Sequence, residues 1–141
     1  DRLAVFSDIL SFLECVVSRN YVAIDFYDGS IMYDFANGKT TICDIDLFHK
    51  QPCVNDMGRM WGSSRFQSPE EYQLGADIDE ITNVYTLGAT AFALFGEYNR
   101  TREKWQLSDK LFEIATRAVS DDRTKRQQSI RQFTAEWEAA Q

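Results

Sequence analysis

The chain has 141 residues, of which 44% are hydrophobic and 26% are charged, and its formal net charge is −7. This length suits one domain with its own core, and the composition is that of an ordinary globular protein. An acidic surface repels phosphate backbones, which argues against nucleic acid as a partner, and no apolar run is long enough to span a bilayer. We therefore expect a single domain over residues 1–141, with no membrane partner in this segment.

The first part of the chain predicts a helix followed by a hairpin. Apolar residues recur at helical spacing over residues 2–18, and Asp28-Gly29 is a turn signal. Two β-type runs follow at residues 31–35 and 40–45, and Asn37-Gly38 lies between them. Because Asn-Gly accepts the positive φ values of a type I′ turn, we expect a β-hairpin here.

The rest of the chain predicts a long loop and three helices. Residues 46–67 show no sustained period, which is typical of a functional or disordered segment, but Met57, Met60, Trp61 and Phe66 favour packing over disorder. Residues 78–95 are apolar on more than one face and end at Gly96, so we expect a buried helix. Ser108 can cap the next helix, and Ser129 with Gln132 can form a capping box for the last one. The predicted fold class is mainly α with a small β-hairpin, within the α+β family.

Three cysteines and one histidine restrict the metal and disulfide chemistry. Cys15, Cys43 and Cys53 have no metal-type spacing and are odd in number, which predicts reduced thiols and a cytoplasmic location. His49 has no cysteine or histidine neighbour in sequence, so neither a zinc site nor a Ser-His-Asp triad is expected. The basic cluster of Arg123, Lys125 and Arg126 is expected to be a solvated connection between helices rather than a binding patch.

Five short segments occur in an informative order. They are Asp25–Ser30, Cys43–Asp46, Gly62–Glu70, Asn83–Gly88 and Arg126. Together they resemble the large C-terminal lobe of a eukaryotic-type serine/threonine protein kinase of bacterial flavour. This lobe has a kinase fold, and the small N-terminal lobe that clamps ATP is expected to be missing from this chain.

The resemblance implies a catalytic carboxylate and a magnesium site. Asp25 would accept or orient the proton of the substrate hydroxyl, and Asp44 would bind the Mg²⁺ that bridges the ATP phosphates. Ser30 takes the position of the family's second metal ligand, an asparagine, so metal binding there is weakened. Read without the resemblance, Asp25 and Asp28 are more simply turn carboxylates.

Further site residues follow from the same resemblance. Met32 and Cys43 would form the floor of the adenine pocket, although both also suit a core, and the hydroxyl of Ser63 would meet Asp25. Glu70 would pair with the distant Arg126, because a buried carboxylate without a partner is costly. Asn83 would hydrogen-bond the backbone of the catalytic loop, and Gly88 would allow close packing.

Departures from the family pattern keep a second interpretation open. Ala23-Ile24 replaces the family's His-Arg pair, which makes control by loop phosphorylation unexpected, and Tyr27 replaces a lysine near the transferred phosphate. Asp46 replaces the glycine after Asp44-Ile45. These replacements support a pseudokinase or scaffold, whereas the retained Asp25 and Asp44 argue against it.

The sequence therefore predicts a protein serine/threonine kinase that transfers the γ-phosphoryl group of ATP to a protein substrate with Mg²⁺. Without the missing N-terminal lobe we expect this chain alone to be inactive. A pseudokinase or scaffold is the main alternative. A small-molecule phosphotransferase is a further one, which the long segment Gly62–Glu70 and Arg126 disfavour. The cleft surface, including Met32 and Ile45, would be exposed and could support self-association.

Overall fold

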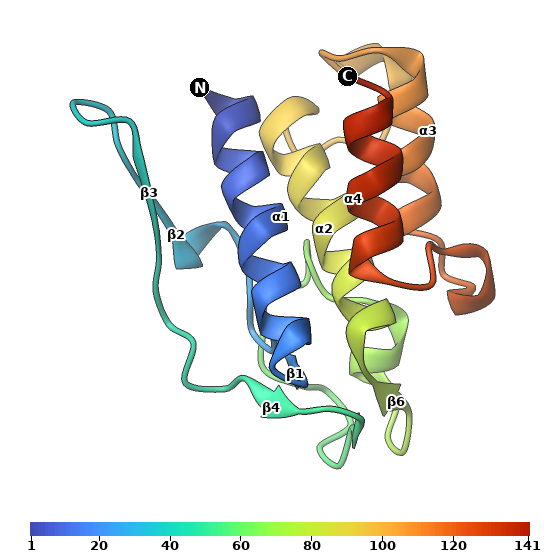
Figure 1. The fold of residues 1–141 in the computed structure, drawn as a ribbon. Coiled ribbons are helices and arrows are strands. Elements are labelled where there is room, and N and C mark those ends of the chain that lie inside the picture. Colours follow the sequence, from blue (N-terminus) through green and yellow to red (C-terminus); the bar gives the residue numbers. More distant parts are fainter.

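The computed structural model describes all residues from Asp1 to Gln141. Four helices lie side by side, and three small antiparallel sheets of two strands each lie beside them and at one end (Figure 1). The helices are α1 (Arg2–Ser18), α2 (Glu80–Phe95), α3 (Asp109–Ala118) and α4 (Ile130–Ala139). This arrangement confirms the coarse prediction of a mainly α fold with a hairpin. No helix combines the length and the apolar character that crossing a membrane requires.

Helix α2 occupies the centre of the bundle and contacts the other three helices. Its side chains are buried almost all round, as the apolar pattern of residues 78–95 predicts. Aromatic rings fill the space around it. The ring centres of Phe6 in α1 and Trp137 in α4 are 4.6 Å apart, and those of Phe92 in α2 and Trp105 are 5.2 Å apart. Such ring pairs add to the free energy gained by burial, so this aromatic cluster anchors the bundle.

Side chains cap the helices as their sequences suggest. Asp79 accepts a hydrogen bond from the Ile81 amide at the start of α2, and Ser129 accepts one from the Gln132 amide at the start of α4. The expected capping box at Ser129 is only half formed, because the Gln132 side chain accepts from the amide of Gln128 instead. The cap therefore reaches one residue further back than the motif predicts.

The predicted hairpin is present, but its turn differs from the prediction. Strand β2 (Ile31–Asp34) pairs with β3 (Lys39–Ile42), and Asp34 lies opposite Lys39. Four residues therefore form the loop, and of these only Gly38 has a positive φ, of 63°. The type I′ assignment to Asn37-Gly38 is wrong because the Asp34 carboxylate accepts hydrogen bonds from the backbone amides of Ala36 and Asn37, which stabilises a longer loop.

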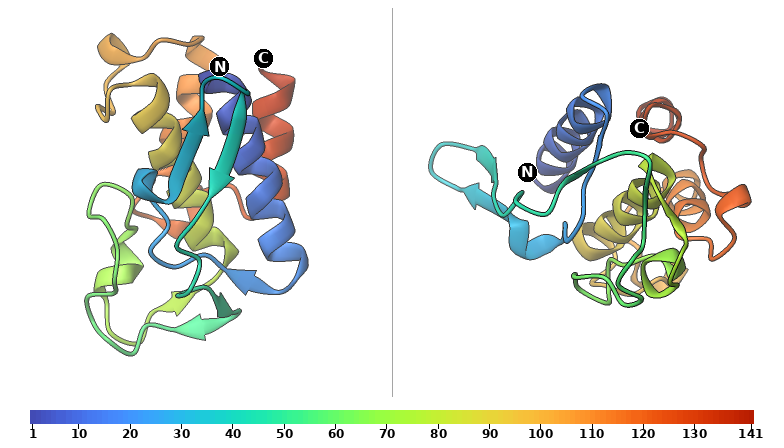
Figure 2. Two further views of the ribbon diagram at one scale, coloured as in Figure 1. Left: turned by 90° about the vertical axis from the view of Figure 1, so that its left-hand side faces the viewer. Right: turned by 90° about the horizontal axis from the view of Figure 1, so that it is seen from below.

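The hairpin runs alongside α1, and the Thr40 hydroxyl donates to Asp8 of that helix at 2.6 Å (Figure 2). Below it, the segment without a sequence period is held by short strands. Strand β4 (His49–Lys50) pairs with β1 (Tyr21–Val22), and β5 (Cys53–Val54) pairs with β6 (Asp77–Ile78). Residues 46–67 are thus ordered by pairing with distant parts of the chain, which no local pattern encodes.

Gly88 marks the closest approach between α2 and α3. A Cβ atom on Gly88 would lie 2.7 Å from the Cβ of Ala118 and 2.9 Å from the carbonyl oxygen of Ala115. Both distances are shorter than van der Waals contact. Glycine is therefore required by packing here, as the sequence predicts.

We expect Gly88→Ala to lower the free energy of unfolding by about 1–2 kcal/mol, because overpacking outweighs the better helix propensity of alanine. Urea denaturation followed by circular dichroism measures the change. Thr116→Ala, on the exposed face of α3, is the control and should leave the stability nearly unchanged. An equally stable Gly88→Ala variant would show that the two helices can separate at no cost.

Candidate functional site

Two carboxylates predicted to act together, Asp25 and Asp44, come from separate loops. Asp25 follows β1, and Asp44 follows β3. Both have left-handed backbone conformations, with φ values of 58° and 55°. Residues in such conformations persist only where their surroundings hold them, and they are frequent at functional sites.

Hydrogen bonds between distant residues hold the two loops. The Ala23 amide donates to Oδ1 of Asn83 at 2.7 Å, and Nδ2 of Asn83 donates to the Ala23 carbonyl at 2.8 Å. This confirms the predicted link between α2 and the loop of Asp25. The Cys43 amide donates to the Ser30 carbonyl at 2.9 Å, so the residues on either side of the hairpin are tied together.

The electrostatics of Asp25 place the two carboxylates in one region. Partial burial raises the pKa of Asp25, and the negative charge of Asp44 raises that pKa further. A carboxyl group with a raised pKa binds a proton more readily near neutral pH. Asp44 itself is exposed, so this acidic pair lies at the surface rather than in the core.

The other predicted site residues are less well placed. Ser30 is completely buried, and its hydroxyl has no hydrogen-bond partner in the protein. Met32 points outward from the hairpin and is 60% exposed, so it lies on an open face and not in an enclosed pocket. Cys43 is partly buried, and its thiol lies 3.5 Å from the Ser30 carbonyl. No hydrogen bond joins the hydroxyl of Ser63 to Asp25, so their predicted contact is not formed here.

The donor set limits the metal that this region could hold. No three histidine, cysteine, aspartate or glutamate side chains form a metal-binding cluster. Asp25 and Asp44 offer two hard oxygen ligands that repel each other, which a divalent cation between them would relieve. Mg²⁺ commonly takes one or two protein carboxylates and completes its shell with water and phosphate oxygens. The two aspartates fit that requirement, whereas Ser30 would have to turn out of the core to join them.

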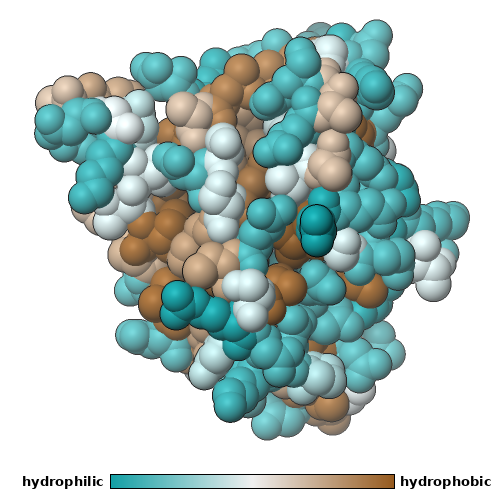
Figure 3. All heavy atoms as spheres, in the orientation of Figure 1, coloured by the Kyte–Doolittle hydropathy of each residue, from teal (hydrophilic) through white to brown (hydrophobic).

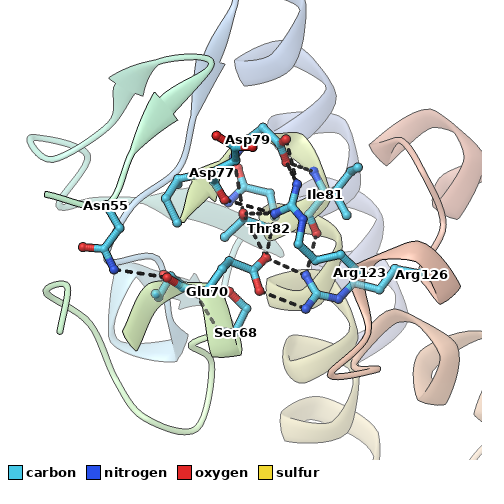
Figure 4. A network of polar contacts seen from close by, with 12 residues as sticks. Asn55, Ser68, Glu70, Asp77, Asp79, Ile81, Thr82, Arg123 and Arg126 are labelled. Atoms are coloured by element: carbon cyan, nitrogen blue, oxygen red, sulfur yellow. Dashed lines mark hydrogen bonds and ion pairs between the residues drawn. The ribbon is translucent and has the colours of Figure 1, made fainter. Parts of the chain in front are cut away.

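A buried ion pair fixes the end of the segment Gly62–Glu70, where Glu70 points toward Arg126 (Figure 4). Glu70 is 4% exposed and Arg126 is completely buried, and two hydrogen bonds of 2.7 and 2.9 Å join them. Burial alone would raise the pKa of Glu70, but the hydrogen bonds and charge of Arg126 outweigh it and hold the pKa below its usual range. The predicted pairing of these two distant residues is confirmed.

Arg123 belongs to the same network, which corrects the expectation for residues 123–126. Its guanidinium donates to Glu70 at 3.0 Å and to both carboxylate oxygens of Asp79 at 2.9 and 2.8 Å. The Thr82 hydroxyl also donates to Glu70. The expectation of a solvated connection is therefore wrong for Arg123 and Arg126, which form ion pairs inside the protein, whereas Lys125 is exposed.

Sequence reasoning missed several polar residues that shape the same segment. Buried Asn55 donates to the carbonyls of Gly58 and Glu70, and Gln67 donates to the carbonyl of Met60. Glu71 accepts hydrogen bonds from the amide and hydroxyl of Ser68, yet its burial raises its pKa to about 7. Asn55 and Gln67 lie in a stretch without a period, so no local signal identifies them.

An apolar pocket of about 360 Å³ lies next to the loop of Asp25. Its lining begins at Ile24, immediately before Asp25, and includes Met57, Met60 and Trp61, immediately before the segment Gly62–Glu70. Another face is also apolar. Figure 3 shows hydrophobic residues at the surface where the chain crosses from β3 to β4 beside α1, and Ile45 there is 50% exposed.

Aromatic contacts connect the loop of Asp25 with residues further along the chain. The rings of Tyr27 and Phe66 lie 6.5 Å apart, and so do the rings of Phe66 and Tyr98. The Tyr98 hydroxyl donates to the Asp28 carboxylate, and this bond together with burial raises the pKa of Tyr98. Tyr98 also has a left-handed backbone, with a φ of 61°. It was not recognised in the sequence.

No protein-family model matches this chain, and a comparison with curated protein sequences finds no significant match.

We expect Glu70→Gln to lower the free energy of unfolding at pH 7 by about 3 kcal/mol, because it leaves the buried charge of Arg126 without its main counterion. Denaturant unfolding at several pH values measures the change. The folded-state pKa of Glu70 is below the ordinary glutamate value of 4.5, so the stabilisation is present above pH 4.5 and is lost as the pH falls below it. The difference between the two proteins should shrink accordingly.

The exposed ion pair between Arg102 and Asp109 provides the control. Asp109→Asn should change stability little at any of these pH values, because solvent screens exposed pairs. Equal effects of Glu70→Gln and Asp109→Asn would contradict the assignment of a buried, stabilising pair.

A second prediction tests the proximity of Asp25 and Asp44. Asp44→Asn removes one charge and tolerates the left-handed backbone, so the pKa of Asp25 should fall. Carboxyl carbon chemical shifts of Asp25, followed by NMR across a pH titration, report the pKa directly. Asp121→Asn, an exposed position beyond α3, should leave it unchanged. If the pKa of Asp25 is unchanged in Asp44→Asn, the two carboxylates are not close enough to interact.

Proposed function

We propose that this chain is the large lobe of a protein serine/threonine kinase, which with an ATP-clamping lobe transfers the γ-phosphoryl group of ATP to a protein hydroxyl. The observation that carries this proposal is that Asp25 and Asp44, which the resemblance assigns to one site, lie near enough for the charge of Asp44 to raise the pKa of Asp25. The sequence assigns these two residues complementary roles before their positions are known. The predicted pair of Glu70 and Arg126 supports the same assignment, because it concerns residues 56 positions apart.

In this proposal Asp25 orients the substrate hydroxyl and accepts its proton. A positioned carboxylate within reach of the hydroxyl can accept its proton in the transition state. Asp44 holds the metal side of the site through its exposed carboxylate. Bound Mg²⁺–ATP would supply the phosphoryl group and offset the negative charge on its oxygens.

A protein is favoured over a small molecule as the phosphoryl acceptor. Residues 62–70 form an ordered segment that the Glu70 network fastens to the bundle. The apolar pocket lined by Met57, Met60 and Trp61 is also lined by Ile24, the residue before Asp25. A shaped surface beside the reacting residues suits an extended peptide better than a compact metabolite.

One observation favours a second candidate, a pseudokinase that binds a partner without catalysis. Ser30 is sealed from solvent, and no cluster of three ligands exists, so metal binding would depend on two carboxylates. Ala23 and Ile24 are also buried in place of the family's His-Arg pair. A scaffold would keep the bundle and the segment 62–70 and have no need of metal.

Paramagnetic NMR with Mn²⁺ and ADP tests the metal site in this chain alone. Mn²⁺ replaces Mg²⁺ and broadens the amide signals of nearby residues. We expect selective broadening of the signals around Asp25 and Asp44. In Asp44→Asn, at least about tenfold more Mn²⁺ should be needed for the same broadening, because one of two protein ligands is lost. Asp121→Asn should broaden like the unmodified chain.

The chain alone should show no measurable phosphotransfer, since residues 1–141 offer no glycine-rich loop and clamping lysine. Broadening confined to other carboxylates, or unaffected by Asp44→Asn, would favour the scaffold. Robust transfer from ATP by residues 1–141 would contradict the division of the site between two lobes.

A further inference from the structure

Two arginines near the loop of Asp25 are held in place by tyrosine rings. The guanidinium carbon of Arg65 lies 4.8 Å from the centre of the Tyr98 ring, and that of Arg100 lies 5.2 Å from the Tyr85 ring. Arg100 also donates to the Tyr85 hydroxyl at 2.9 Å and to the backbone carbonyl of Arg65 at 3.2 Å. The two arginines are therefore linked to each other as well as to the rings.

Neither arginine is neutralised by a carboxylate. The five arginine ion pairs use Arg102, Arg117, Arg123 and Arg126, and none involves Arg65 or Arg100. Asp28 accepts a hydrogen bond from the Tyr98 hydroxyl and forms no ion pair with either arginine. Glu97, one residue before Tyr98, pairs with Lys104 instead. In a chain of net charge −7, two adjacent exposed cations without an acidic partner can bind an anionic group of another molecule.

Other exposed cations also lack a carboxylate, but their positions are not fixed in this way. Arg131 and Lys110, for example, make no side-chain hydrogen bond and lie on no ring. Arg65 is stacked on a ring, and Arg100 is both stacked and hydrogen-bonded. Each guanidinium has therefore lost rotamer freedom already, so less entropy is lost when it binds an anion. Stacking distinguishes Arg65, and stacking with a hydrogen bond distinguishes Arg100, from cations such as Arg131 and Lys110.

The position of the pair connects it with the candidate site. Arg65 lies within the segment Gly62–Glu70, immediately before Phe66. Phe66 lies between Tyr27 and Tyr98 in the aromatic contacts, and Tyr98 is bonded to Asp28, three residues after Asp25. A peptide whose hydroxyl approached Asp25 would therefore pass close to these two guanidinium groups.

We infer that Arg65 and Arg100 bind an acidic segment of a protein, whose glutamate or aspartate side chain lies beside the accepting hydroxyl. As a statement about the substrate, this inference rests on the proposed function. The binding itself requires only the two arginines and the tyrosines that hold them. Nucleic acid is disfavoured as the occupant, because two cations on an acidic protein cannot neutralise the several phosphates of even a short strand.

Fluorescence anisotropy with three labelled probes tests the inference on this chain. The first probe is a short peptide with a central serine flanked by glutamates. The second carries glutamine in place of each glutamate, and the third is a single-stranded oligonucleotide of the same charge as the first. We expect the glutamate peptide alone to bind, with an affinity that falls as the salt concentration rises.

Substitution of the arginines should weaken only the glutamate peptide. Arg65→Gln and Arg100→Gln should each weaken its binding about fivefold and together about 20-fold, as exposed but preorganised ionic contacts allow. Arg59→Gln is the matched control, because Arg59 lies 6.0 Å from the Tyr72 ring without a carboxylate partner but away from Tyr98. Arg100→Lys retains charge but not the planar stack, so it should restore only part of the affinity.

Three results would overturn the inference: equal binding of the glutamate and glutamine peptides, equal binding of the oligonucleotide, or equal loss of affinity in Arg59→Gln and Arg65→Gln. The Mn²⁺–ADP measurement separates this outcome from the fate of the kinase proposal. Acidic-peptide binding through Arg65 and Arg100 without metal binding at Asp44 would leave this site assigned and the kinase proposal refuted. Metal binding at Asp44 with no preference for the acidic peptide would do the reverse.

Discussion

The buried pair of Glu70 and Arg126 is the interaction on which the lower part of the structure depends. It joins the end of a long irregular segment to the connection between α3 and α4, which the helices alone would leave apart. Burying two charges is costly unless their hydrogen bonds are satisfied, and here Arg126 also donates to the Ser120 and Ile81 carbonyls. This network is therefore stabilising because the hydrogen bonds of both buried charges are satisfied. Removing Glu70 leaves the buried charge of Arg126 without its counterion, whereas removing Arg126 leaves Glu70 with Arg123 alone.

Local patterns predict the helices well, because each buries a face whose spacing is written in consecutive residues. Residues 2–18 and the cap at Ser108 are examples, since both depend on neighbours within one or two turns. The hairpin turn shows the limit of this reasoning. The backbone of Asn37-Gly38 permits a type I′ turn, but the carboxylate of Asp34 decides the loop, and propensities of the two turn residues do not include it.

The candidate site divides in the same way. The positions of Asp25, Asp44 and the partner of Glu70 follow from an ordered set of motifs, which carries information about distant contacts that composition lacks. The burial of Ser30 does not follow, because it depends on how tightly the turn before β2 packs. The roles of Tyr98 and Arg123 could not be predicted for a further reason. Each forms a hydrogen bond with a residue more than 40 positions away, and no motif surrounds it.

The two sets of charges near Tyr98 place opposing demands on a bound peptide. Asp25 and Asp44 already repel each other, so an acidic segment brought to them would be repelled as well. The guanidinium group of Arg65 lies on the Tyr98 ring and that of Arg100 on the Tyr85 ring, where the proposed acidic segment would be attracted without neutralising the carboxylates. Because Tyr98 donates to Asp28 while its ring carries Arg65, one side chain fixes the spacing between the acidic loop and the basic pair. Because Tyr98 keeps the arginines apart from the aspartates, the same surface could bind a negatively charged peptide while Asp25 remains free to accept a proton.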